Sequence, residues 1–226
     1  MGQSIPAISE LPLKSLTPPY WAVEALKDPL ALLNDHAWLE KKAAANALEM
    51  ISRWPPPKPP KNWVNVLAGV ARDEAVHLSQ VVRILGRRGG NLTRSHSNTY
   101  ANGLRGLVRQ GRGSLEILDR LLISALIELR SCERFSVLAE AAETCDPELA
   151  KLYRTLWTSE LGHYHVFLKL AGGVVKPEQV SERWEFMLIS EAEILASQPT
   201  GPRMHSGIDS KCDKVMKNST ASSINL

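Results

Sequence analysis

Apolar residues recur at spacings of three and four along most of the chain, the pattern of amphipathic helices rather than strands. The pattern predicts five long helices, over about residues 28–54, 62–88, 114–143, 147–172 and 177–198. Proline-rich residues 55–60 must end the first helix, and paired glycines at 89–90 and 172–173 end the second and fourth. Since no convincing alternating strand is present, we expect an all-α fold.

The order of the helices predicts how they pack. Short connections join the first helix to the second and the third to the fourth, so each pair should be antiparallel. A long glycine-rich segment, residues 86–113, separates the two pairs. A four-helix bundle with one long crossover is the ferritin-like arrangement, here with an additional C-terminal helix. We expect one domain over residues 1–207 and a disordered tail over the polar, aperiodic residues 208–226.

Carboxylate and imidazole side chains interrupt the apolar stripe of each of the first four helices. On the fourth helix, for example, Leu156 precedes the interruption and Phe167 follows it. The apolar register resumes beyond each interruption, which places these polar residues on the buried face. The six are Glu40 on the first helix, Glu74 and His77 on the second, Glu128 on the third, and Glu160 and His163 on the fourth.

These six residue types suit a pair of metal ions. Unpaired carboxylates and imidazoles in a core would be very costly, and two divalent cations would neutralise them. One Glu from each of two helices and a Glu-x-x-His from each of the others is the di-iron carboxylate signature. The two halves nearly repeat, since Glu40 and Glu74 lie 34 residues apart and Glu128 and Glu160 lie 32 apart. Ligands without thiolate favour iron or manganese over structural zinc.

The alternative interpretation places the same side chains at solvated helix edges, with Glu40 and Glu128 in surface salt bridges. Glu49 and Glu133 also compete as carboxylates, but their helical phase takes them off the stripe, toward solvent or a supporting role. His36, one turn before Glu40, is either a support for that carboxylate or a capping, partly exposed histidine.

Composition limits the class of protein. A chain of 226 residues that is 44% hydrophobic suits one globular domain with a sizeable core. Neither a membrane-length apolar run nor a secretory signal is evident. Three widely spaced cysteines (Cys132, Cys145 and Cys212) form no CxxC pair. They indicate a reducing compartment, so we expect a cytoplasmic protein without a disulfide scaffold.

Positive charge is concentrated in one band. The net charge is only +3, yet residues 75–115 contain no Asp or Glu. We interpret this band as a candidate RNA-binding surface; the alternative is a solvated, flexible crossover. Its seven arginines are Arg83, Arg87, Arg88, Arg94, Arg105, Arg109 and Arg112.

Five segments resemble a known family: "LLNDHAWLEKKAAANAL", "RDEAVHLSQV", "ALIELRSCERFSVLA", "LWTSELGHYHVF" and "PRMHSG". Together they resemble the tRNA 2-methylthio-N6-isopentenyladenosine hydroxylases, over about residues 26–207. The resemblance implies a ferritin-like di-iron enzyme that uses dioxygen to hydroxylate the isopentenyl side chain of a modified adenosine beside the anticodon. It also implies that the six stripe residues bind two iron ions.

Two further expectations concern partners. The sequence shows no flavin, nicotinamide or iron–sulfur motif, so an external electron donor or reductase is expected beside tRNA; the oligomeric state stays open. Two other classes compete with the tRNA hydroxylase. One is another ferritin-like di-iron protein, such as a ferroxidase or small-molecule oxygenase, and the other is a non-catalytic helical RNA-binding module.

Overall fold

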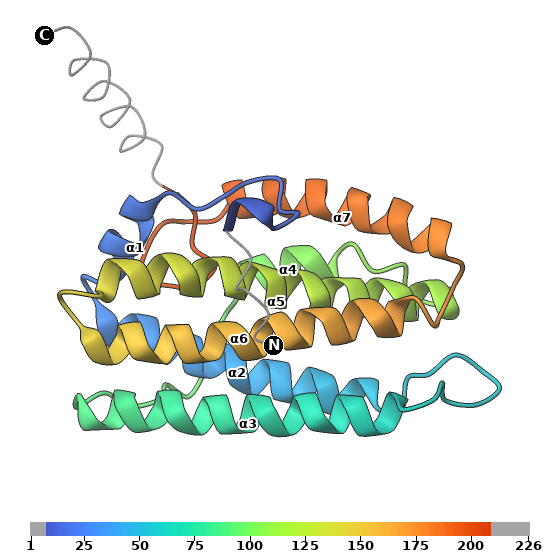
Figure 1. The fold of residues 1–226 in the computed structure, drawn as a ribbon, viewed down its shortest axis with the longest axis horizontal. Coiled ribbons are helices and arrows are strands. Elements are labelled where there is room, and N and C mark those ends of the chain that lie inside the picture. The colour runs from blue at the N-terminus through green and yellow to red at the C-terminus, as the bar shows by residue number, and fades with distance from the viewer. Residues whose placement is uncertain (1–7, 209–226) are drawn as a thin grey trace, which may run out of the picture.

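The computed structural model describes residues 8–208, and within this range every regular element is a helix (Figure 1). The elements are η1 (Ile8–Glu10), α1 (Pro19–Ala25), α2 (Pro29–Met50), α3 (Trp63–Arg87), α4 (Thr99–Arg105), α5 (Ser114–Ala142), α6 (Pro147–Ala171) and α7 (Pro177–Ala196). The predicted all-α, ferritin-like bundle with one long crossover and an added C-terminal helix is confirmed. Residues 209–226 of the expected tail lie outside the described residues, and the domain limit near residue 207 stays a prediction.

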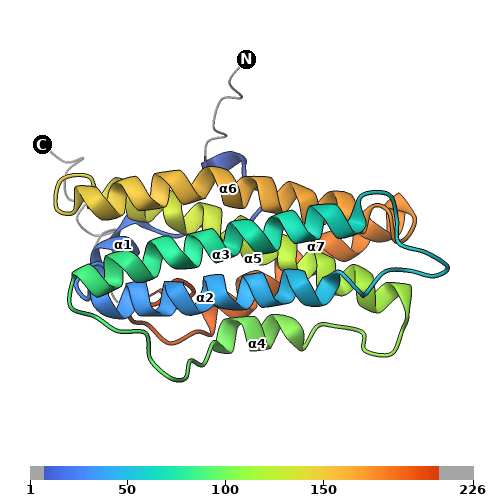
Figure 2. The ribbon, with the colours of Figure 1, turned by 90° about the horizontal axis from the view of Figure 1, so that it is seen from below.

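The four long helices form two antiparallel pairs. Helix α2 packs along α3, α5 packs along α6, and α3 meets α6 between the pairs. Helices α1 and α7 form a further layer against α5 (Figure 1). The crossover from α3 to α5 runs the length of the bundle and carries α4 on the side of α2 (Figure 2).

Helices α2 and α6 each begin with an Asp that caps the helix. Asp28 accepts a hydrogen bond from the Ala31 amide at 3.0 Å, and Asp146 accepts one from the Leu149 amide at 3.2 Å. A proline follows each of these caps at the first helical position. Helix α5 begins differently, because Gly113 holds the cap position with φ +55° and no side chain caps the helix.

The first long helix ends earlier than predicted, at Met50 rather than near Trp54. The indole Nε1 of Trp63 donates to the Met50 carbonyl at 2.9 Å, which satisfies one of the carbonyls left free at the end of α2. Since Trp63 is fully buried and begins α3, this bond also fixes how the chain re-enters the bundle.

Helices α1 and α4 were not predicted, because seven residues are too few to show a helical period. Tertiary packing holds both of them. On α1, Trp21 is buried and the Arg134 guanidinium lies 3.8 Å from its ring centroid. On α4, Tyr100 and Leu104 are buried against the bundle.

Two apolar clusters fill the bundle, one toward each end. One contains Trp63, Leu67, Leu121 and Phe167, and the other contains Leu33, Val81, Phe135 and Leu156. Helices α2, α3, α5 and α6 each contribute residues to both clusters. The polar residues identified in the sequence lie along these helices between the two clusters.

Helix α5 is the central element, since α1, α4, α6 and α7 all pack against it. The expectation that Glu133 on α5 faces solvent or supports the metal residues is wrong. Glu133 is fully buried under the N-terminal segment, where Oε2 accepts from the Thr17 hydroxyl at 2.7 Å and from Arg130 at 3.0 Å. Helical phase failed here because it identifies one buried face, and α5 is covered on several.

Two further expectations concern the cysteines and the membrane. Cys132 is buried, Cys145 is exposed, and both are free thiols; Cys212 lies outside the described residues. Between residues 8 and 208, no helix combines the length and the apolar character that crossing a bilayer requires.

Asp119 fastens the end of the crossover to α5 and α7. Its carboxylate is fully buried, and it accepts hydrogen bonds from the backbone and guanidinium of Arg109 at 2.7–2.9 Å. Arg183 on α7 donates to the same carboxylate at 2.8 Å. Burial alone would raise the pKa of Asp119, but these two arginines outweigh it and lower the pKa.

Replacing Asp119 by Ala should therefore lower the free energy of unfolding by about 2 to 3 kcal/mol, because two arginines lose their buried partner. Urea denaturation followed by circular dichroism measures this. The control is Glu24→Ala, which breaks an exposed ion pair with Lys27 and should cost less than about 1 kcal/mol. Equal effects of the two substitutions would contradict the role given to Asp119.

Candidate metal centre and its cavity

The structure brings the six predicted metal residues together at the middle of the bundle. Glu40 comes from α2, Glu74 and His77 from α3, Glu128 from α5, and Glu160 and His163 from α6. Each is buried, with 1–6% of its surface exposed. Neither Glu40 nor Glu128 lies at a solvated helix edge.

The six residues form two overlapping groups. One consists of Glu40, Glu74, His77 and Glu160, and the other of Glu74, Glu128, Glu160 and His163. Within each group, one possible ligand atom from every residue lies within 4.8 Å of the others. Glu74 and Glu160 belong to both groups, so the arrangement offers two adjacent ion positions that share two carboxylates.

Both histidines turn Nδ1 toward the shared carboxylates. Nδ1 of His77 lies 3.0 Å from Oε1 of Glu160, and Nδ1 of His163 lies 2.8 Å from Oε1 of Glu74. The two ring centroids are 5.8 Å apart. Because residues at i and i+3 project from the same helix face, each histidine also lies near the glutamate of its own helix, at 3.5 Å on α3 and 3.3 Å on α6.

Burial dominates the electrostatics of the carboxylates. It raises the pKa of Glu40 and Glu128, and together with Glu160 and Glu40 it raises the pKa of Glu74 to about 8. Burial would also raise the pKa of Glu160, but hydrogen bonds to the two histidines outweigh it and lower the pKa.

The histidines respond to these carboxylates in the opposite sense. Burial would lower the pKa of His77 and of His163. The close carboxylates of the neighbouring glutamates outweigh burial, and they raise the pKa to about 12 for His77 and about 10 for His163. Protons are therefore held tightly at positions where a cation would provide the same compensation.

Several possible ligand atoms lack a hydrogen bond of normal geometry within the described part of the chain. They are both carboxylate oxygens of Glu74, Oε1 of Glu160, Nδ1 of His77 and Nε2 of His163, all of them buried. Buried polar atoms without partners are uncommon in folded proteins. Oxygen and nitrogen donors grouped in this way, without thiolate, fit divalent metal ions such as iron or manganese.

His36 supports this centre. It is 1% exposed, and Nε2 lies 2.5 Å from Oε1 of Glu40. Burial lowers the pKa of His36 to about 4, and its Nε2 shares a hydrogen bond with the Glu40 carboxyl group. This decides between the two interpretations of His36 in favour of support for Glu40. Glu49, by contrast, is exposed and pairs with Arg53.

The predicted arginine band divides into two kinds of residue. Arg87 and Arg88 pair with Glu148, Arg88 also pairs with Asp146, and Arg109 pairs with Asp119. The other four are exposed and form no ion pair within residues 8–208: Arg83, Arg94, Arg105 and Arg112. The assignment of the band to RNA stays a prediction.

A cavity of about 720 Å³, partly open to solvent, lies beside the centre between α2, α4 and α5. Leu39, Ala43, Val108, Ile123 and Ile127 give it apolar walls, and its polar residues are Lys42, Asn46, Asn98, Arg105, Arg120, Ser124, Glu128 and His205. A smaller cavity of about 330 Å³ is lined by Glu40, Glu74, Glu128 and Glu160.

The two cavities meet. Five residues line both of them: Leu39, Ala43, Ile127, Glu128 and His205. The outer cavity was not predicted, because its walls come from four separate segments of the chain. Some of its residues did carry a signal: Leu39, Ile127 and His205 lie in segments of the family resemblance, and Arg105 belongs to the arginine band.

Comparison with known proteins agrees with this geometry. The sequence profile of the tRNA-(MS[2]IO[6]A)-hydroxylase (MiaE) family matches residues 3–206. The chain is 38% identical over 192 residues to the tRNA 2-(methylsulfanyl)-N(6)-isopentenyladenosine(37) hydroxylase of Pseudomonas putida, covering 85% of this chain and 90% of that protein. It is 33% identical over 137 residues to the hydroxylase of that name from Salmonella typhimurium, covering 61% of this chain and 49% of that protein.

A solved structure is also similar. It is described as protein 43 with aldehyde deformylating oxygenase activity from Synechococcus. The TM-score is 0.78 at 33% sequence identity, over 86% of this chain and 96% of that one. The resemblance identified from sequence segments is confirmed, and by the profile match over most of its length the chain belongs to the tRNA-(MS[2]IO[6]A)-hydroxylase (MiaE) family.

Proposed function

We propose that this protein is a dioxygen-dependent di-iron monooxygenase that hydroxylates the isopentenyl side chain of 2-methylthio-N6-isopentenyladenosine in tRNA. The observation that carries the proposal is the cavity that opens beside Arg105 and reaches Glu128 in the carboxylate centre. Like most small-molecule sites, it combines apolar walls with a few polar groups. Membership of the hydroxylase family supports the choice of substrate.

The six residues divide naturally between two irons. Glu40 and His77 would hold one, Glu128 and His163 the other, and Glu74 and Glu160 would contact both. When bound, the irons supply dioxygen activation, and two electrons from an external reductase allow one oxygen atom to enter the C–H bond while the other leaves as water. His36 keeps Glu40 in place through its hydrogen bond.

The cavity's own residues would place the substrate. Leu39, Ala43 and Ile127 line the passage to the centre, and they would pack against the prenyl chain and exclude water from it. The outer part is polar and carries the basic side chains Lys42, Arg105 and Arg120, of which Arg120 pairs with Glu116 at 3.0 Å. An apolar inner end and a cationic outer part match an apolar side chain carried on an anionic polymer. A protein acting on tRNA would work in the cytoplasm.

Another ferritin-like oxygenase, acting on a small apolar molecule, is the second candidate. The Synechococcus structure with aldehyde deformylating oxygenase activity favours it, because its fold and sequence are close to this chain. The cationic rim argues against it, since an aldehyde would make no use of three basic side chains. A ferroxidase would need neither the rim nor the amphipathic cavity.

Nucleoside analysis of tRNA tests the function directly. A host that makes the prenylated nucleoside but lacks its hydroxylase should accumulate the hydroxylated form when this chain is expressed. Persistence of the unhydroxylated nucleoside, with iron-loaded protein present, would refute the proposal. Oxidation of long-chain aldehydes by the same preparation would support the second candidate instead.

Replacing Glu128 or His163 by Ala should abolish binding of at least one iron and eliminate hydroxylation, because each is a terminal ligand in the proposed centre. The helical circular dichroism signal should largely survive, since the apolar clusters at both ends are untouched. Iron per chain is measured by elemental analysis. His165→Ala, an exposed neighbour on the same helix, is the control and should keep full iron. Full iron content in both ligand variants would contradict the assignment.

Replacing Arg105 by Ala should weaken tRNA binding and reduce the slope of log K against log salt by about one. Arg105 lines the cavity and is exposed, and within residues 8–208 its one hydrogen bond is a 3.5 Å contact to Asn102. The control is Arg154→Ala, on the exposed face of α6, where the arginine pairs with Glu143. A salt titration by filter binding makes the comparison, and an unchanged slope for Arg105→Ala would remove it from the RNA surface.

A further inference from the structure

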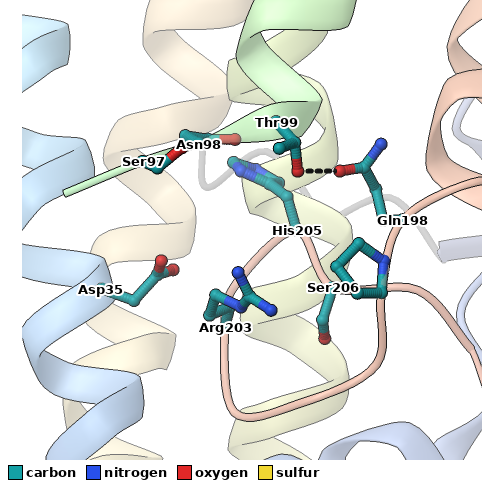
Figure 3. A pocket seen from close by; sticks show the side chains of 9 residues that line it. Asp35, Ser97, Asn98, Thr99, Gln198, Arg203, His205 and Ser206 are labelled. Carbon is teal, nitrogen blue, oxygen red and sulfur yellow. Dashed lines mark hydrogen bonds between the residues drawn. The ribbon is translucent and has the colours of Figure 1, made fainter.

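His205 is a buried imidazole without a hydrogen-bonding partner. It is 6% exposed, and neither Nδ1 nor Nε2 makes a hydrogen bond within the described residues. Its ring stacks on Tyr100 with centroids 4.4 Å apart. Figure 3 shows it on the loop after α7, directed toward Asn98 and Thr99 at the start of α4.

The position of His205 connects three spaces. It lines the cavity of Figure 3, the amphipathic cavity and the smaller cavity at the carboxylate centre. It therefore lies beside Glu128, on the wall that the amphipathic cavity shares with the smaller cavity.

The loop around His205 is fixed on both sides. The Met204 amide donates to Asp35 at 2.9 Å, and Ser206 accepts from the Trp21 indole at 2.9 Å. Gly207 packs so closely on Gln198 that an added Cβ would lie 2.0 Å from the Gln198 carbonyl oxygen. The backbone is thus held firmly while the imidazole between these anchors is left unpaired, which is how a preorganised binding group is built.

Several other polar side chains of the amphipathic cavity already have partners. Asn46 donates to the Ser124 hydroxyl at 2.9 Å, and Ser124 donates to the Arg120 carbonyl. Lys42 contacts Nδ1 of His96 at 2.9 Å. His205, by contrast, has both ring nitrogens buried and without a hydrogen bond within residues 8–208.

The protonation of His205 defines what it can bind. Burial, with the positive charges of Arg134 and Arg130, lowers its pKa well below 6.5. A neutral imidazole has one donor and one acceptor nitrogen. The prenylated adenine offers the matching pair, because its N6 carries one hydrogen and its ring nitrogens accept.

We propose that His205 positions the adenine of the substrate by accepting a hydrogen bond from N6–H where the cavity meets the carboxylate centre. This inference rests on the proposed function. N6 is the atom that bears the prenyl chain, so holding it at His205 directs the chain past Leu39 and Ile127 toward Glu128. His205 then selects for a substrate with an N–H at that position.

The test compares two synthetic anticodon stem-loops. One carries the N6-isopentenyl adenosine, and the other carries the same chain through an ether oxygen, which removes the N–H. Wild-type protein should prefer the first by about tenfold or more in kcat/KM, because the second leaves a buried acceptor unpaired. His205→Phe, which keeps the stacked ring, should lose that preference through a fall of about tenfold on the first substrate alone.

Controls separate binding from structure. Iron content and thermal midpoint are measured for each variant, and His165→Phe on the exposed face of α6 should behave as wild type. If His205→Phe unfolds or loses iron, His205→Gln should keep the preference for the N–H substrate and His205→Leu should lose it.

Three results would overturn the inference: no preference in the wild type, an unchanged preference in His205→Phe, or an equal loss on both substrates with iron retained. Failure of the wild type to hydroxylate either stem-loop would instead reject the proposed function.

Discussion

Burying four carboxylates and two imidazoles in the middle of a helical bundle is the constraint on which the rest of the structure depends. Such groups are costly to desolvate, so they need either protons or cations as compensation. Stability comes from the apolar clusters on either side, which the same four helices share. Because the polar layer is flanked in this way, Glu74 and Glu160 can be held at fixed positions between facing helices. The residues that stabilise the fold and the residues that would bind metal are thus separated along the bundle axis.

Asp35 holds two loop segments in place at the edge of the centre. One carboxylate oxygen lies 2.7 Å from Nε2 of His96 in the crossover, and the other accepts from the Met204 amide at 2.9 Å. A single side chain on α2 therefore joins two segments that are far from it in sequence. His96 in turn stacks on Trp38 and contacts Lys42. The crossover and the loop after α7 are consequently fixed to α2, and the cavity between them has a defined shape.

The sequence predicted the parts of the molecule in which apolar residues recur with a regular helical period. The long helices and the six inward polar residues follow from a period that many apolar positions support, such as Leu156 and Phe167 around Glu160 and His163. It could not predict α1 and α4, which are too short to show a period. It also misplaced Glu133, because α5 is covered on several sides. The cavity escaped prediction for a related reason, since Leu39, Arg105, Ile123 and His205 meet only in the folded chain.

The pairing of charged residues also depends on the folded structure and could not be predicted from the sequence. In the sequence the arginine band is uniform, but folding pairs Arg88 with Asp146 and Arg109 with Asp119, acids that lie outside the band or at its edge. These arginines stabilise the crossover, and fewer remain for a polyanion. In the proposed enzyme, the unpaired cations near the cavity would give salt-dependent affinity without selecting a nucleotide. Selection must then come from inside the cavity, where the buried groups discriminate most strongly because an unmatched partner there has no water to replace it.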